Sequence, residues 1–115
     1  MNGLEWIVEA HGCDAAALMN QERLEELFRL IVAAMDLHPL DKTNWHQFPN
    51  TGGITGVSLL RESHITCHTF PEYESLCLNV FCCRPRQAGN FEALLKIGFA
   101  PSRVSVRQVE RPYQL

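Results

Sequence analysis

The segment Ser75-Leu76-Cys77-Leu78-Asn79-Val80-Phe81-Cys82-Cys83 alternates between two kinds of position. Its even-numbered residues are all apolar, whereas its odd-numbered residues are a mixture of polar, aromatic and sulfur-containing side chains. Because successive side chains of a β-strand point to opposite faces of the sheet, the segment predicts a strand with one face in a hydrophobic core. The second face is mixed, and it is not the polar face of a sheet exposed to water.

Further strands are predicted on both sides of this one. Turn-forming residues at 49–53 and 71–74 delimit strands at residues 44–48, 54–61 and 64–70. Residues 4–9 predict a first strand. Residues 102–109 alternate valine and charged side chains imperfectly, which is typical of an outer strand.

Two helices are predicted between the strands. Asn20 is expected to cap the first, with Glu22 near its positive end. This helix is expected to end before Pro39, and its apolar residues recur at helical spacing: Leu24, Leu27, Phe28, Ile31, Val32 and Met35. A shorter helix is expected to begin after Asn90 and to stop at Gly98.

The order of these elements predicts the fold class. A strand and a helix, then a run of strands, then a helix and a strand indicate one α+β domain over residues 1–115. We expect a two-layer α/β sandwich, with an antiparallel sheet and two helices on one face. Because the helices cover only one face, the mixed second face is expected to pack against the sheet of a second copy. The result would be an α/β/β/α homodimer.

Composition excludes several classes of protein. The ten lysine and arginine residues are scattered and the net charge is −3, which argues against a nucleic-acid surface. No apolar run approaches the roughly 20 residues of a membrane span, and no signal peptide is recognisable. We therefore expect a cytoplasmic protein whose five cysteines are reduced thiols.

The most reactive stretch is Glu62-Ser63-His64-Ile65-Thr66-Cys67-His68-Thr69-Phe70-Pro71-Glu72. Two acids, a serine and two histidines fall within it, more than a core strand needs. A zinc site is the alternative, since His64, His68 and the Cys82-Cys83 pair offer ligands. The chain has no Cys-x2-Cys pair, and histidines four apart come close together only on a helix. We therefore predict no metal.

This stretch resembles the self-cleaving segment of the small bacterial and archaeal S-adenosylmethionine decarboxylases. The resemblance extends, in order, over almost the whole chain through Gly12-Cys13-Asp14, His46-Gln47-Phe48-Pro49, Gly53-Ile54-Thr55-Gly56-Val57, Val80-Phe81-Cys82-Cys83, Arg103-Val104-Ser105-Val106-Arg107 and Glu110-Arg111. Residues of these types are usually structural when they occur singly. Their joint spacing makes the resemblance specific.

The resemblance implies that the chain makes its own cofactor. Ser63 would attack the carbonyl of Glu62, and elimination and hydrolysis would leave a pyruvoyl group derived from Ser63 at the start of the second fragment. The ketone would form an imine with the substrate amine and accept electrons as CO₂ leaves. By the same resemblance, His68 and Thr55 assist the cleavage, and Cys83 returns a proton to the decarboxylated carbon.

The resemblance also implies how the substrate binds. Phe48 would stack on the adenine of S-adenosylmethionine, and Glu72 would hold its ribose hydroxyls. Since Ser63 and His68 are five residues apart, they point to opposite faces of one strand. One chain cannot easily aim both at one centre. The family's dimer implies an answer: Ser63 and Cys83 come from one subunit, and Thr55, His68 and Glu72 come from the other.

Several residues depart from the family pattern. Thr55 stands where a serine is usual, and its methyl group restricts the side chain. Other departures are His11 for an aromatic residue, Glu74-Ser75 for a Gly-Tyr-like pair, Asn79 for aspartate, Cys82 for threonine and Arg84 for glycine. Most are expected around the substrate, so a second hypothesis is a pyruvoyl-dependent decarboxylase of L-ornithine or L-arginine, with Glu74 near the distal cation. A third is an uncleaved homologue without enzyme activity.

Overall fold

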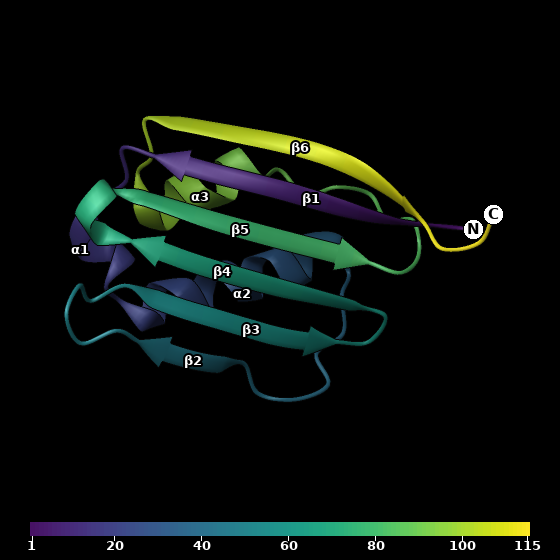
Figure 1. Cartoon of the computed structure of the whole chain (residues 1–115), viewed down its shortest axis with the longest axis horizontal. Coiled ribbons are helices and arrows are strands. Elements are labelled where there is room, and N and C mark those ends of the chain that lie inside the picture. The colour runs from purple at the N-terminus through teal and green to yellow at the C-terminus, as the bar shows by residue number, and fades with distance from the viewer.

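Six antiparallel strands form one sheet in the computed structural model, which describes residues 1–115 (Figure 1). The order across the sheet is β2-β3-β4-β5-β1-β6. The strands are β1 Asn2–His11, β2 Asn44–Gln47, β3 Ile54–Leu60, β4 Ser63–Phe70, β5 Ser75–Cys82 and β6 Arg103–Pro112. The predicted antiparallel sheet is confirmed, and β6 is an outer strand as expected. The first and last strands are longer than predicted.

Both predicted helices are present, and they lie on one face of the sheet (Figure 1). Helix α2, Gln21–Met35, begins where the Asn20 side chain accepts hydrogen bonds from two backbone amides. Helix α3, Phe91–Phe99, is capped by Asn90 and ends one residue beyond the predicted Gly98. Two single turns were not predicted, α1 at Ala15–Leu18 and the 3₁₀ helix η1 at Pro71–Tyr73. They are too short to show a helical period.

The hydrophobic core lies between the helices and the sheet. It combines the apolar stripe of α2 with the even-numbered residues of β5 and the tryptophan of β1, Trp6. Each fully buried leucine contributes about 1.5–3 kcal/mol, compared with about 1 kcal/mol for a helix cap. Packing of the apolar stripe therefore holds α2 on the sheet more strongly than its cap does.

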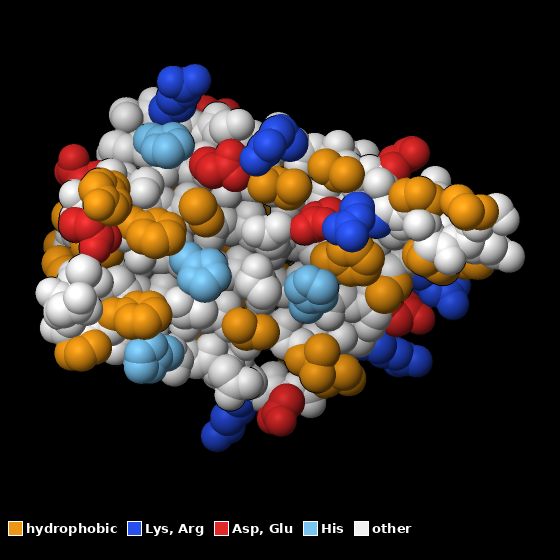
Figure 2. Space-filling model, viewed as in Figure 1, with side chains coloured by type: hydrophobic (Ala, Val, Ile, Leu, Met, Phe, Trp, Pro, Cys, Tyr) orange, Lys and Arg blue, Asp and Glu red, His pale blue; other side chains and the backbone are white.

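The other face of the sheet carries no helix, and we call it the open face. Figure 2, which views this face, shows hydrophobic and histidine side chains spread across it. Val57, Leu59, Phe70 and Val109 are among its exposed apolar residues. Two ion pairs, Glu9 with Arg107 and Glu5 with Arg111, lie between β1 and β6. The mixed second face predicted from β5 is thus confirmed.

The register of β4 sets the positions of the reactive residues. A two-residue turn, Arg61-Glu62, joins β3 to β4 between the paired residues Leu60 and Ser63. The odd-numbered residues of β4 face the core, and its even-numbered residues lie on the open face. None of the helices combines the length and apolar composition needed to cross a membrane.

Candidate active site

Ser63 is the first residue of β4, and its side chain is on the core side of the sheet with 7% of its surface exposed. Its hydroxyl oxygen is the one buried side-chain polar atom without a hydrogen-bond partner. Buried polar groups are almost always paired, so an unpaired hydroxyl calls for an explanation such as a catalytic role. The lone pairs of this oxygen are free to attack a neighbouring carbonyl.

Glu62 precedes Ser63 with a backbone φ of 63°, in the left-handed region. For a residue other than glycine this conformation costs about 1–2 kcal/mol, and such strain often marks functional sites. The carbonyl oxygen of Glu62 accepts a 2.8 Å hydrogen bond from the Cys83 amide. That donor is aimed at the oxygen that would become negative if Ser63 attacked the carbonyl carbon.

The two adjacent cysteines have different environments. Cys82 is buried on the core side, whereas Cys83 is exposed just beyond the end of β5. Burial raises the pKa of the Cys82 thiol, an effect that Arg86 partly offsets. The resemblance implies that Cys83 is the reactive cysteine, and the structure places it beside the Glu62–Ser63 bond.

Thr55 and His68 lie opposite each other on β3 and β4, on the open face. The Thr55 hydroxyl is 2.9 Å from Nδ1 of His68. A cavity of about 290 Å³ adjoins this pair, and Phe48 and Glu72 also line it. The structure therefore brings together Thr55, His68 and Glu72, which were predicted to form one half of the site, and places Phe48, the predicted stacking residue, beside them.

The two groups of predicted residues lie at opposite ends of β4. Five residues separate Ser63 from His68, which corresponds to about 17 Å along a strand. Their side chains also point to opposite faces of the sheet. No residue of this chain contacts the Ser63 hydroxyl as a base would. One chain thus carries the predicted site residues in two separate groups.

Glu74 does not join either group. It is exposed, it ends η1 with a φ of 53°, and it does not line the cavity that contains His68. Its carbonyl instead accepts the amide of Cys13. Of the other departures from the family pattern, Asn79 donates a 2.7 Å hydrogen bond to Glu5, and Arg84 forms an ion pair with Glu62.

Sequence reasoning missed some residues of the cavity. Phe70 lies two residues after His68 on the same face of β4, so the strand period could have identified it. Asn50 and Thr51 come from the loop between β2 and β3, whose approach to the cavity no local pattern predicts.

Cys77 is paired with His68 across β4 and β5. Burial, with a smaller effect of Glu9, raises the pKa of the Cys77 thiol.

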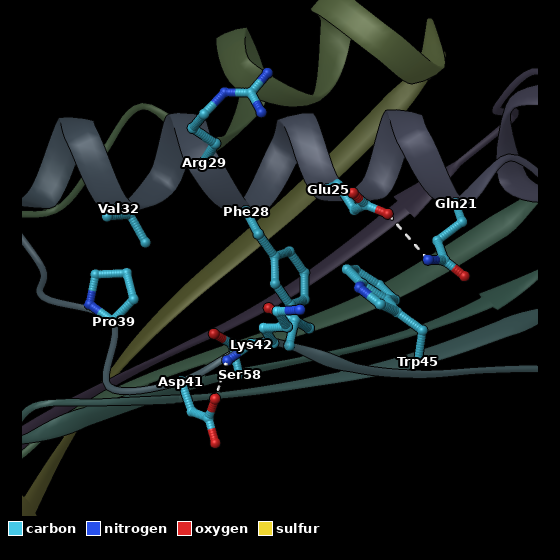
Figure 3. Close-up of a pocket in the computed structure, with 11 residues that line it drawn as sticks. Gln21, Glu25, Phe28, Arg29, Val32, Pro39, Asp41, Lys42, Trp45 and Ser58 are labelled. Carbon is cyan, nitrogen blue, oxygen red and sulfur yellow. Dashed lines mark hydrogen bonds between the residues drawn. The ribbon is translucent and has the colours of Figure 1, made fainter.

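A larger cavity of about 500 Å³ lies between α2 and β2 (Figure 3). Phe28 and Trp45 pack against each other there with ring centroids 4.9 Å apart, and Gln21 donates to Glu25 at its edge. None of the predicted site residues lines it. This cavity lies on the helix side of the sheet, away from Thr55 and His68 on the open face. It is therefore not the candidate active site, although it is larger.

Comparison with known proteins identifies relatives along the whole chain. A family model described as S-adenosylmethionine decarboxylase matches residues 4–112. An S-adenosylmethionine decarboxylase proenzyme of Thermococcus gammatolerans is 37% identical over 81 residues, which are 70% of this chain. One of Picrophilus torridus is 28% identical over 98% of the chain. An arginine decarboxylase proenzyme of Ignicoccus hospitalis is 34% identical over 66% of the chain.

These relatives differ in how much of their own length is matched. The matched part is 86% of the Picrophilus protein. It is 55% of the Thermococcus protein and 53% of the Ignicoccus protein, so the chain spans about half the length of these two. The names of all three describe a precursor of a decarboxylase.

Proposed function

The chain belongs to the S-adenosylmethionine decarboxylase family, and from that premise we propose that it is a self-processing, pyruvoyl-dependent decarboxylase of S-adenosylmethionine. One observation carries this proposal. An unpaired, buried Ser63 hydroxyl follows a residue in a left-handed conformation, whose carbonyl already accepts a hydrogen bond from Cys83.

Self-processing begins at the Glu62–Ser63 bond. The Ser63 hydroxyl loses its proton and adds to the Glu62 carbonyl carbon, the C–N bond breaks, and an ester with a free Ser63 amine results. Loss of the Ser63 α-proton then expels Glu62 as a carboxylate and leaves a dehydroalanine. Its enamine form rearranges to an imine, and water replaces the nitrogen, which leaves as ammonia. The keto group of a pyruvoyl residue remains at position 63.

The residues around position 63 fit this group. The Cys83 amide stabilises the negative oxygen formed during the attack. A pyruvoyl group supplies a ketone that binds the substrate amine and accepts electrons as CO₂ leaves. Cleavage releases residue 63 from its turn, so it can rotate from the core side toward the open face. The exposed Cys83 then donates a proton to the product carbon from that face.

A second copy of the chain completes each site. Two sheets that pack through their open faces in opposite strand directions bring the Ser63 end of one β4 over the His68 end of the other. His68 of the partner subunit then approaches residue 63 from the open face, where it acts as the base that removes the Ser63 α-proton in the elimination step, held by the hydroxyl of Thr55 of the partner subunit. A positioned histidine contributes about 10²–10⁴-fold in rate.

The cavity beside His68 would receive the part of the substrate that does not react. Phe48 offers a ring for stacking, and the Glu72 carboxylate accepts hydrogen bonds from ribose hydroxyls. A basic amino acid is the second candidate substrate, because one relative is an arginine decarboxylase proenzyme. A guanidinium would pair with Glu72. Glu74 lies outside this cavity and is less well placed for that contact.

Intact mass followed by a decarboxylation screen tests the proposal. We expect two fragments, of residues 1–62 and 63–115, with the second carrying a keto group that reacts with a hydrazine. The cleaved protein should release CO₂ from S-adenosylmethionine. Release from arginine or ornithine alone would establish the second candidate. A full-length chain without a keto group would instead identify an uncleaved homologue that is not an enzyme.

A further inference from the structure

We propose that Arg84 is a positioning residue for self-cleavage. Its guanidinium holds the Glu62 side chain and so keeps the carbonyl of the scissile bond hydrogen-bonded to the Cys83 amide. This inference rests on the proposed function, because it concerns the rate at which the Glu62–Ser63 bond breaks.

Two consecutive residues, Cys83 and Arg84, contact Glu62. The Cys83 amide donates to the Glu62 carbonyl at 2.8 Å, and Nε of Arg84 lies 3.3 Å from Oε1 of Glu62. One contact holds the backbone and the other holds the side chain. Together they restrict rotation of the peptide plane that Ser63 must attack, because both ends of the residue are fixed.

Glu62 needs such a restraint because of its backbone conformation. Its φ of 63° is in the left-handed region, where a side chain with a Cβ is disfavoured. Turns with a positive φ at this position normally use glycine or asparagine. A glutamate without a partner would spend part of its time in other conformations, with its carbonyl away from the Cys83 amide.

The segment that carries Arg84 is itself anchored. The Tyr113 hydroxyl donates to the Cys83 carbonyl at 3.1 Å, and Nη1 of Arg86 donates to the carbonyl of Asp36 at 3.0 Å. On the other side, the Arg61 amide donates to the His38 carbonyl at 2.7 Å. Arg84 and Glu62 therefore join two fixed segments.

The expected effect is modest. The side chains of Arg84 and Glu62 are 64% and 44% exposed, and exposed ion pairs are weak and sensitive to salt. Losing the pair should therefore slow cleavage by about two- to fivefold. This is far less than the effect of losing a catalytic base.

The test follows cleavage of freshly translated chains by gel and intact mass. Cleavage should be two- to fivefold slower, by equal amounts, in Arg84→Ala, in Glu62→Gln and in the double variant. Arg84→Lys, which keeps the charge, should recover part of the rate. Raising the salt concentration should slow the wild-type chain but not Arg84→Ala. Arg61→Ala, in the same turn but with no ion pair to Glu62, is the control and should cleave at the wild-type rate.

Three results would contradict the inference. The first is cleavage of Arg84→Ala at the wild-type rate. The second is cleavage of Glu62→Gln at the wild-type rate while Arg84→Ala is slow. The third is a double variant that cleaves more slowly than either single variant. Glu62→Gln preserves the shape of the side chain, and a thermal melt of each variant excludes a folding defect. If the wild-type chain itself did not cleave, the proposed function would fail, and this outcome is distinct from all three.

Discussion

The Thr55 hydroxyl and Nδ1 of His68 lie 2.9 Å apart across β3 and β4, at the edge of the cavity that also contains Phe48 and Glu72. A hydrogen bond to Nδ1 fixes both the orientation of the imidazole and its tautomer, which leaves Nε2 for the reaction. In the proposed mechanism Thr55 therefore acts through His68, and the serine usual in the family would serve the same purpose.

Thr55→Val should slow self-cleavage about fivefold, because it removes one hydrogen bond and preserves the shape of the side chain. Thr55→Ser keeps the hydroxyl and should cleave at least as fast as the wild-type chain. A time course of fragment formation measures both rates. Equal rates for valine and threonine would show that the hydroxyl has no part in the reaction.

Mixing two inactive variants tests whether the site is shared between subunits. His68→Ala should be cleaved about 10²–10⁴-fold more slowly than the wild-type chain, and Ser63→Ala should not be cleaved. When the two are expressed together, the His68→Ala chain should be cleaved, since the Ser63→Ala chain still supplies His68. Different affinity tags identify which chain breaks.

The control for this experiment is His68→Ala expressed with a chain that carries both changes. Cleavage there should stay as slow as in His68→Ala alone, because neither chain supplies His68. If His68→Ala remains uncleaved beside Ser63→Ala, although the tags show that mixed dimers form, then His68 acts within its own chain.

Two open faces should no longer pack against each other when a charge is placed on that face. Val57 is 43% exposed on β3, with its side chain on the open face. Val57→Lys should yield a monomer in light scattering after size-exclusion chromatography, because an unpaired lysine is costly to bury between two sheets. Ile97→Lys is the matched control: Ile97 is 65% exposed on α3, on the opposite side of the molecule. A dimer in both variants would place the interface elsewhere.

Local patterns predicted the parts of the fold that depend on local chemistry. The period of β5 separated Cys82 from Cys83, and one proves buried while the other is exposed. Asn20 and Asn90 cap the helices as predicted, because a short amide side chain satisfies free amides wherever a helix begins. The same period placed Ser63 and His68 on opposite faces of β4.

Features that depend on distant segments were not predictable in this way. Strand β1 lies between β5, whose paired residues are 64–78 positions away in the sequence, and β6, whose paired residues are 92–110 positions away. The alternation of side chains along a strand does not indicate which strands lie beside it. The ion pair between Arg84 and Glu62 arises only because the end of β5 lies beside the turn before β4. Helix α1 has four residues, about one turn, which is too few to show a helical period.

Alkaline pH should destabilise the chain through its buried thiols. Burial, with a smaller effect of Glu74, raises the pKa of Cys13 from 9.0 to about 11. Because the folded chain holds this proton more tightly than the unfolded chain, the stabilisation is complete below pH 9.0 and is lost as the pH rises through about 11. The buried Cys67 and Cys82 thiols, whose pKa values are also raised, act in the same direction.

Urea unfolding at pH 8 and 10.5 should therefore give a lower free energy of unfolding at the higher pH. Cys13→Ser cannot titrate in this range, so its free energy of unfolding should fall less between the two pH values. An equal fall in Cys13→Ser and in the wild-type chain would show that Cys13 does not contribute to the loss.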